Sequence, residues 1–195
     1  MKPVALHPIA ENPLPPGAEC LSLLTRDKVQ LRAMRAIPEG ARGTFVLFCG
    51  RGDFMERYFE TMRDLMARGF AVASVDMRGQ GGSARMSHDP YRDVIGSFAD
   101  FDEDVRTLME GMVLPSCPPP YYGLGHSTGA HVLLRNLRGA NWFTRAVLVS
   151  PLIGIDYGAW PGAIVWLLAV PALLLLGALG AGSYFGGWYS GLAGT

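Results

Sequence analysis

A serine between two glycines is the residue of this sequence best suited to act as a nucleophile. Residues 123–131 read GLGHSTGAH, which places Ser127 in a G-x-S-x-G pattern with Gly125 and Gly129. On a sharp strand-to-helix turn, such glycines leave room for a strained serine backbone and lift its hydroxyl above the sheet. The following helix would point its N-terminus at the hydroxyl, so that the N–H of Thr128 faces a developing oxyanion. The pattern therefore predicts attack by the Ser127 hydroxyl on an acyl carbonyl.

The same glycines could belong to a chance match or to a phosphate-binding loop. A chance G-x-S-x-G is common in a chain with 25 glycines, but the strand expected before it and the helix expected after it favour the turn. A dinucleotide-binding loop would need a glycine at position 128, where the sequence has threonine. The sequence therefore indicates neither a nucleotide cofactor nor a metal.

The elements that must position this serine alternate between strand and helix. Apolar runs bounded by glycine or polar residues predict strands, and apolar residues at helical spacing predict helices. The expected strands are two short ones within 21–37 around a polar turn at 26–28, then 44–50, 70–76, 119–125 and 143–150. The expected helices are 53–69, 97–112 and 127–138. This alternation predicts an α/β fold with a mostly parallel sheet.

Polar residues mark where two of these helices should begin. Asp53 is expected to cap the helix 53–69, with Glu56 completing a capping pair three residues later. Ser97 is expected to cap the helix 97–112. The buried stripes should consist of residues at three- and four-residue spacing, namely Met55, Phe59, Met62 and Met66 in the first helix and Phe98, Phe101, Val105, Leu108 and Met112 in the second.

The composition narrows the class of protein. The 195 residues include 17 basic and 17 acidic side chains, so the net charge is zero and a nucleic-acid partner is not expected. Three cysteines, Cys20, Cys49 and Cys117, are few, odd in number and far apart. They argue against a disulfide framework and for a reducing, cytoplasmic compartment.

Charge also divides the chain. No charged side chain occurs from Tyr157 to Thr195, and this shift marks a boundary near residues 151–157. We therefore expect an irregular arm over 1–19, an α/β core over 20–151 and an apolar segment over 152–195.

Three stretches together resemble the α/β-hydrolase superfamily. They read GRGDFMERYFETMRDLMARGFAVASVDMRGQGGSAR, FADFDEDVR and PPPYYGLGHSTGAHVLLR, in that order. The sequence is most similar to bacterial lysophospholipases, monoacylglycerol lipases and the hydrolases grouped as serine aminopeptidases. The resemblance covers about residues 20–155 and implies the N-terminal part of an α/β-hydrolase fold, followed by the start of a helical cap. It implies hydrolysis of a small-molecule lipid or acyl ester, or of a peptide, without a cofactor.

The resemblance also assigns roles to residues. It implies Ser127 as the nucleophile, with the main-chain N–H groups of Thr128 and Arg51 as the oxyanion donors. Many relatives have His-Gly just before the second donor, where this chain has Cys49-Gly50, so a side chain that usually braces that loop is missing. Asp76 is expected to hold the loop that follows it, and not to orient a catalytic histidine.

The acid and the histidine of such a site should follow the serine in chain order. After Ser127 the sequence has only Asp156 and His131, and His131 stands on the expected helix, where it does not approach the serine from a separate loop. His126 is expected to face away, and His7 and His88 precede the serine, with His88 as the only stand-in. This pattern fits either a fragment of a longer hydrolase, which we favour, or a short protein that has lost catalysis.

Residues 160–182 form an uncharged apolar stretch of membrane-spanning length. The stretch is interpreted either as strongly apolar cap helices over a lipid site, broken near Pro171, or as a membrane contact. The absence of a flanking basic residue favours the cap. We expect a cytoplasmic protein with at most peripheral membrane contact through this stretch.

Overall fold

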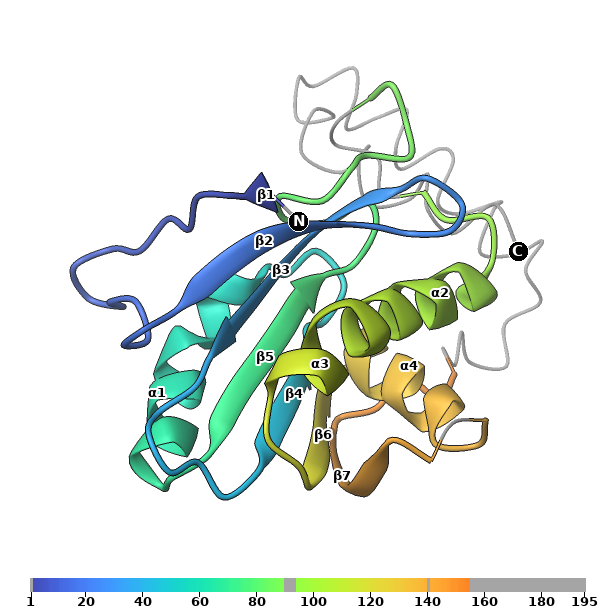
Figure 1. Ribbon diagram of the computed structural model, residues 1–195. Coiled ribbons are helices and arrows are strands. Elements are labelled where there is room, and N and C mark those ends of the chain that lie inside the picture. The colour runs from blue at the N-terminus through green and yellow to red at the C-terminus, as the bar shows by residue number, and fades with distance from the viewer. Residues whose placement is uncertain (1, 90–93, 140, 155–195) are drawn as a thin grey trace, which may run out of the picture.

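A single mixed sheet forms the centre of the protein (Figure 1). The computed structural model describes residues 2–89, 94–139 and 141–154. In these residues the strand order is β1-β2-β3-β5-β4-β6-β7. The strands are β1 (Lys2–Pro3), β2 (Glu19–Leu24), β3 (Gln30–Ala36), β4 (Thr44–Phe48), β5 (Ala71–Asp76), β6 (Tyr121–His126) and β7 (Phe143–Val149).

Six helical segments accompany the described strands. They are the 3₁₀ turn η1 (Met55–Tyr58), α1 (Phe59–Ala67), α2 (Phe98–Leu108), the π-helical turn η2 (Met109–Val113), α3 (Leu114–Ser116) and α4 (Thr128–Asn136). All but α3 coincide with the predicted helices 53–69, 97–112 and 127–138, and the second of these continues beyond its predicted end through η2 into α3.

The second half of the sheet is parallel. β5 pairs with β4, β4 with β6 and β6 with β7 in parallel, whereas β1, β2 and β3 are joined by antiparallel pairings and β3 meets β5 antiparallel. The expected α/β fold with a largely parallel sheet is confirmed. Because parallel strands point the same way, the segments that follow β4, β5 and β6 gather at one edge of the sheet.

Helices cover both faces of the sheet. On one face, α2 and α4 contribute Phe101, Val105 and Leu133 to a core that includes Phe48 and Val75 of the strands. The predicted stripe of α2 is confirmed, with Phe98 only partly buried.

On the other face, η1 and α1 contribute Met55, Phe59 and Met62, which pack against Met34 and Leu47 of the sheet. Figure 1 shows α1 behind the strands, on the side away from α2 and α4. β5 lies between the two cores, which explains why all six of its residues are buried.

One predicted helix start is correct. Ser97 accepts a hydrogen bond from the N–H of Ala99, and the Asp100 carboxylate accepts one from the N–H of Ser97 at 3.0 Å. This reciprocal capping box fixes the first turn of α2.

The other predicted helix start is wrong. Asp53 makes no capping hydrogen bond to the helix, which begins at Met55. The N–H of Met55 donates instead to the Asp76 carboxylate at 2.9 Å, so a residue from the end of β5 caps this helix. Glu56 is buried and binds Arg32, which removes it from the expected capping pair.

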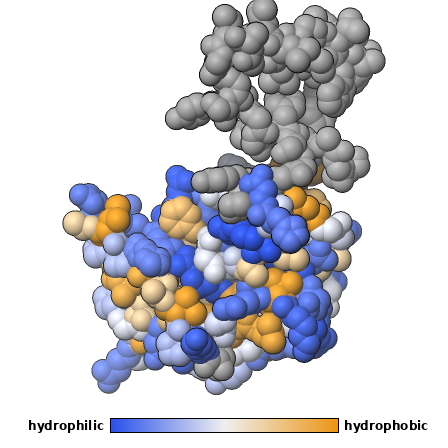
Figure 2. Space-filling model, turned by 90° about the horizontal axis from the view of Figure 1, so that it is seen from above, coloured by the Kyte–Doolittle hydropathy of each residue, from blue (hydrophilic) through white to orange (hydrophobic). Residues whose placement is uncertain are grey.

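The surface seen from above mixes polar and apolar side chains, with orange groups lying between blue ones (Figure 2). Within the ranges described, no helix has the length and apolarity that crossing a membrane would require. The predicted cap or membrane stretch 160–182 lies outside the described residues.

Candidate active site

Ser127 lies at the junction between β6 and α4. β6 ends at His126 and α4 begins at Thr128, so a single residue separates strand from helix. The backbone of Ser127 has φ 53° and ψ −116°, a conformation that non-glycine residues avoid. Holding a serine there costs on the order of 1–3 kcal/mol, and such strain clusters at functional sites. The predicted position and strained backbone of Ser127 are confirmed.

The end of β7 and the segment after it hold this strained residue in place. The N–H of Ser127 donates to the carbonyl of Val149 at 2.9 Å, and the carbonyl of Ser127 accepts from the N–H of Leu152 at 3.1 Å. The same carbonyl accepts from the N–H of His131 in the first turn of α4, also at 3.1 Å. Backbone hydrogen bonds from two directions therefore fix the serine.

The two glycines of the pattern allow close approach of backbones. A Cβ on Gly129 would lie 2.2 Å from the carbonyl oxygen of Phe48 and 2.4 Å from that of Cys49. A Cβ on Gly125 would lie 2.6 Å from the Cα of Ala130. These contacts are below van der Waals distance, so α4 can pack this closely on β4 and β6 only with glycine at both positions.

Arg51 and Thr128 line one small cavity, although 77 positions separate them in the sequence. The cavity has a volume of about 30 Å³. Its remaining walls are apolar and come from Ile95, Phe98, Phe101 and Leu152. The structure thus brings together the two residues whose N–H groups were predicted to serve as oxyanion donors.

The turn that carries Arg51 is fastened to the neighbouring loop. The N–H of Gly52 donates to the side-chain oxygen of Gln80 at 2.6 Å. Gln80 belongs to the glycine-rich loop after β5, and its side chain is buried. Sequence reasoning missed this contact of Gln80, because the loop pattern indicates a turn but not its partner.

Asp76 holds that glycine-rich loop, as predicted. Its carboxylate accepts from the N–H of Gly82 at 2.8 Å and from Nε of Arg32 at 2.7 Å, as well as from the N–H of Met55. Arg32 in turn makes a bidentate pair with Glu56, with both N–O distances 2.7 Å. Burial raises the pKa of Asp76, while Gly82 N–H and Arg32 favour its charged form.

A second buried pair ties the same loop to α2. The guanidinium of Arg78 binds the Asp104 carboxylate at 2.8 and 2.9 Å, and the N–H of Arg78 donates to it as well. Desolvation raises the pKa of Asp104 to about 6, which leaves this carboxylate ionised at neutral pH. Arg78 also binds Asp27 in the turn between β2 and β3.

Cys49 is not a competing nucleophile. Its side chain is buried at the end of β4, and burial strongly raises the pKa of its thiol. A thiol that stays protonated is a poor nucleophile. The strained, glycine-flanked Ser127 therefore remains the candidate.

The four histidines of the chain contact groups other than the Ser127 hydroxyl. Nδ1 of His126 lies 3.1 Å from the Tyr58 hydroxyl, and the ring of His131 packs 4.8 Å from that of Phe98. Nδ1 of His131 is buried without a hydrogen-bond partner. His88 lies in the loop after β5, and His7 lies in the N-terminal arm. Among the described residues, no imidazole makes a hydrogen bond with the Ser127 hydroxyl.

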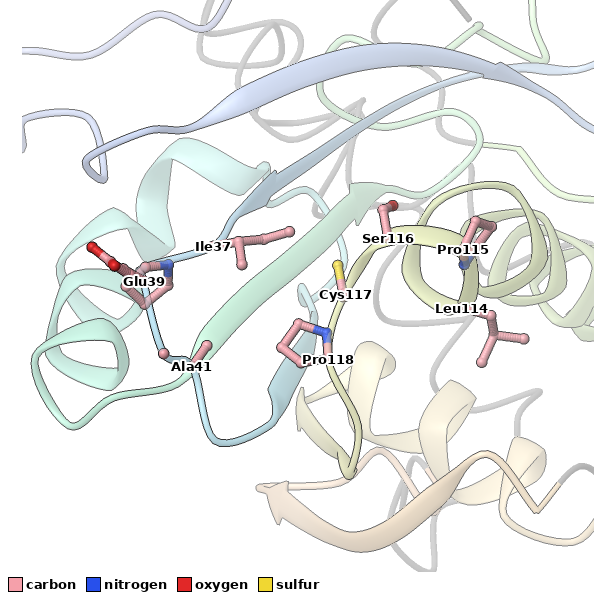
Figure 3. Close-up of a pocket in the computed structure, with 10 residues that line it drawn as sticks. Ile37, Glu39, Ala41, Leu114, Pro115, Ser116, Cys117 and Pro118 are labelled. Carbon is pink, nitrogen blue, oxygen red and sulfur yellow. The ribbon is translucent and has the colours of Figure 1, made fainter.

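A larger hollow of about 600 Å³ lies at the opposite edge of the sheet (Figure 3). It is lined by residues 37–41 before β4 and 114–118 before β6. Ligand sites in parallel sheets lie beyond the carboxyl ends of the strands, whereas this hollow lies at their amino ends. In the part of the chain that the structure covers, no group of three or more His, Cys, Asp or Glu side chains could hold a metal.

Comparison with known proteins agrees with this fold. The family described as serine aminopeptidase, S33, matches residues 39–179. Lysophospholipase L2 of Escherichia coli K12 is 29% identical over 130 residues, which are 66% of this chain and 38% of that protein. A probable lysophospholipase L2 of Haemophilus influenzae is 31% identical over 122 residues, covering 60% of this chain and 38% of the relative. The chain thus spans about two fifths of the length of these relatives.

Solved structures of esterases share the architecture. A carboxyl esterase from Bacillus coagulans superposes with a TM-score of 0.56 and 22% identity, over 84% of this chain and 51% of that one. A carboxylesterase from Bacillus subtilis superposes with a TM-score of 0.54 and 20% identity, over 69% of this chain and 43% of that one. The chain belongs to the serine aminopeptidase S33 family and has the α/β-hydrolase fold of its lysophospholipase-like branch.

Proposed function

We propose that Ser127 is the nucleophile of a serine esterase site that acts on acyl esters of lipids. The observation that carries the proposal is the strained backbone of Ser127 between β6 and α4. The site residues of the proposal are Ser127 and the oxyanion donors Arg51 and Thr128, with Gly125 and Gly129 as the glycines that permit the turn.

In the proposed reaction the Ser127 hydroxyl attacks the carbonyl carbon of the ester. Its oxygen forms the new bond, its proton passes to a base, and the carbonyl oxygen becomes an oxyanion. The N–H groups of Thr128 and Arg51 donate to this oxyanion, supported by the cavity that both residues line. Collapse of the intermediate expels the alcohol, and water then releases the acid from the acyl-enzyme.

The chain supplies the nucleophile half of this site and not the base. The surroundings of the four histidines support this part of the proposal, since His126 is bound to Tyr58 and His131 packs on Phe98. The predicted domain limits belong to the same proposal: an arm over 1–19, the core over 20–151 and an apolar cap-like segment over 152–195, in which residues 160–182 form the cap or a peripheral membrane contact.

A lipid ester is the substrate class that the comparisons favour. The curated relatives are named lysophospholipases, and the walls beside Thr128 are the apolar side chains of Phe98, Phe101 and Leu152. The family description names an aminopeptidase, so a peptide is the second candidate. Comparing the hydrolysis of an aminoacyl p-nitroanilide with that of an acyl p-nitrophenyl ester distinguishes the peptide from the ester substrate.

The test is acylation of Ser127 by a p-nitrophenyl acyl ester. Intact-mass and peptide analysis of the purified chain should find an acyl adduct on Ser127 that is absent in Ser127→Ala. Turnover should be slow, because losing a member of a catalytic triad removes several orders of magnitude in rate.

Two results would count against the proposal. An adduct of equal yield in Ser127→Ala would exclude Ser127 as the nucleophile. Turnover as fast as that of intact lipases would instead show that the chain has a base of its own, with His88 the first residue to replace.

A further inference from the structure

Three polar side chains meet beside the candidate nucleophile. The hydroxyl of Tyr58 lies 2.9 Å from Oδ2 of Asp53 and 3.1 Å from Nδ1 of His126. His126 directly precedes Ser127, while Asp53 and Tyr58 come from the turn after β4 and from η1. The reaction proposed for Ser127 uses none of the three.

Counting protons fixes the direction of these hydrogen bonds. Asp53 is mostly buried and pairs with Arg57 at 3.0 Å, and its Oδ2 accepts the hydrogen bond that the Tyr58 hydroxyl donates. The single proton of the Tyr58 hydroxyl therefore points at Asp53. The short contact between Tyr58 and His126 then needs a proton from the imidazole, so Nδ1 of His126 carries the hydrogen and Nε2 is left as an acceptor.

The cluster is also hydrogen-bonded to the turn that carries Arg51. The N–H of Gly50 donates to the Tyr58 hydroxyl at 3.4 Å, and the N–H of Asp53 donates to the carbonyl of Gly50 at 3.3 Å. A Cβ on Gly50 would lie 3.0 Å from Nδ1 of His126 and 3.2 Å from Oδ2 of Asp53. Residue 50 thus lies directly against the cluster, with no space between them.

We propose that Asp53, Tyr58 and His126 are positioning residues that hold the turn 50–53 against the end of β6, with His126 fixed in its Nδ1–H form. The proposal rests on the function proposed for Ser127. Through this chain of hydrogen bonds, the segment that supplies the Arg51 N–H is tied to the residue before the nucleophile. The distance between the two oxyanion donors is then set by side chains that touch neither substrate nor oxyanion.

A first test needs no catalysis. In a ¹⁵N-labelled sample of the full chain, at a pH above the ordinary imidazole titration range, long-range ¹H–¹⁵N correlation should show His126 protonated at Nδ1. Tyr58→Phe removes the acceptor, so His126 should lose this fixed tautomer, and amide exchange at Gly50 and Arg51 should become faster. A wild-type His126 protonated at Nε2, or unchanged exchange in Tyr58→Phe, would overturn the proposal.

Tyr121→Phe is the matched control. It also removes a hydrogen-bonded tyrosine hydroxyl, which donates to the carbonyl of Cys117 at 3.1 Å, but at the far end of β6. It should leave the His126 tautomer and the exchange of the turn as in the wild type.

A second test measures the effect on Ser127. A fluorophosphonate labels the serine when Oγ bonds to phosphorus, fluoride leaves and the hydroxyl proton passes to solvent. We expect Tyr58→Phe and His126→Leu to lower the labelling rate roughly tenfold, as misplaced groups do. His126→Asn should recover much of the loss, because its amide nitrogen can occupy the position of Nδ1 and donate to Tyr58.

The outcomes separate the two proposals. If wild-type Ser127 is not labelled, the proposed function fails, while the tautomer and the exchange still decide whether the cluster positions the turn. If Ser127 is labelled at the same rate in Tyr58→Phe, the positioning role is wrong and the proposed function stands.

Discussion

A few atoms around Ser127 decide whether its backbone can adopt the observed conformation. The nearest constraint is Gly129, whose α-carbon lies against the carbonyl groups of Phe48 and Cys49. These carbonyls belong to the last residue of β4 and to the residue after it, and as backbone groups they cannot turn aside as a flexible side chain could. The start of α4 can therefore approach the end of β4 beside Ser127 only because residue 129 has no side chain.

Gly129→Ala should lower the free energy of unfolding by about 3 kcal/mol or more, because the new methyl overlaps backbone atoms. Gly139→Ala is the matched control, since a Cβ there meets nothing within 4 Å and φ is not positive. It should change stability by less than about 0.5 kcal/mol. Urea unfolding of both variants measures the difference, and equal stability would contradict the packing described for α4.

Local sequence patterns predicted the elements better than the contacts between them. The buried strand β5, the capping box of α2 and the β6–α4 turn each depend on residues within one short stretch, so spacing alone identifies them. Asp53 misled the prediction because its carboxylate binds the side chains of Arg57 and Tyr58, four and five residues further along, and not the first N–H groups of the helix. Pairings such as Tyr58 with His126, 68 positions apart, have no signal in the spacing of a single sequence.

The network at β3 is the clearest case of an element held by distant charges. Arg32 is buried and binds both Glu56 and Asp76. Replacing it with methionine keeps the apolar stem but leaves two buried carboxylates unpaired. Such a loss costs about 3–5 kcal/mol.

Arg32→Met should therefore lower the midpoint of urea unfolding strongly. Arg35→Met on the same strand removes a pair with the exposed Glu19, and it should cost less than about 1 kcal/mol. Similar losses for the two variants would show that the buried network contributes no more than a surface pair. Because Asp76 caps η1 and holds the glycine-rich loop, Arg32→Met should also increase amide exchange at Gly82 and Met55.

At the scale of the whole molecule, the fold buries three unbridged thiols, Cys20, Cys49 and Cys117. Burial raises the pKa of Cys20 and of Cys117 from 9.0 to about 11, and it raises that of Cys49 further. At a pH between 9 and 11, the thiols of the unfolded chain have lost their protons, whereas those of the folded chain retain them. The stabilisation from a neutral thiol is thus complete below pH 9 and is lost as the pH rises through the folded pKa.

The free energy of unfolding should consequently fall between pH 9 and pH 11. Each buried thiol contributes up to about 1.4 kcal/mol per pH unit in this window. Denaturant titrations at several alkaline pH values measure the slope. The double variant Cys20→Ala, Cys117→Ala should show a shallower slope, and an unchanged slope would mean that other groups cause the loss.

The hydrogen bonds that join Ser127 to Val149 and Leu152 also impose an order in time. A ribosome adds about 5–20 residues per second. Val149 and Leu152 are therefore synthesised a second or more after Ser127. Until β7 docks beside β6, residue 127 lacks the hydrogen bonds with Val149 and Leu152, and of the three described for its backbone it keeps the one from His131 in α4. The backbone of the proposed nucleophile is therefore completed by a strand that is synthesised after it, so a growing chain can contain Ser127 before all of its backbone hydrogen bonds exist.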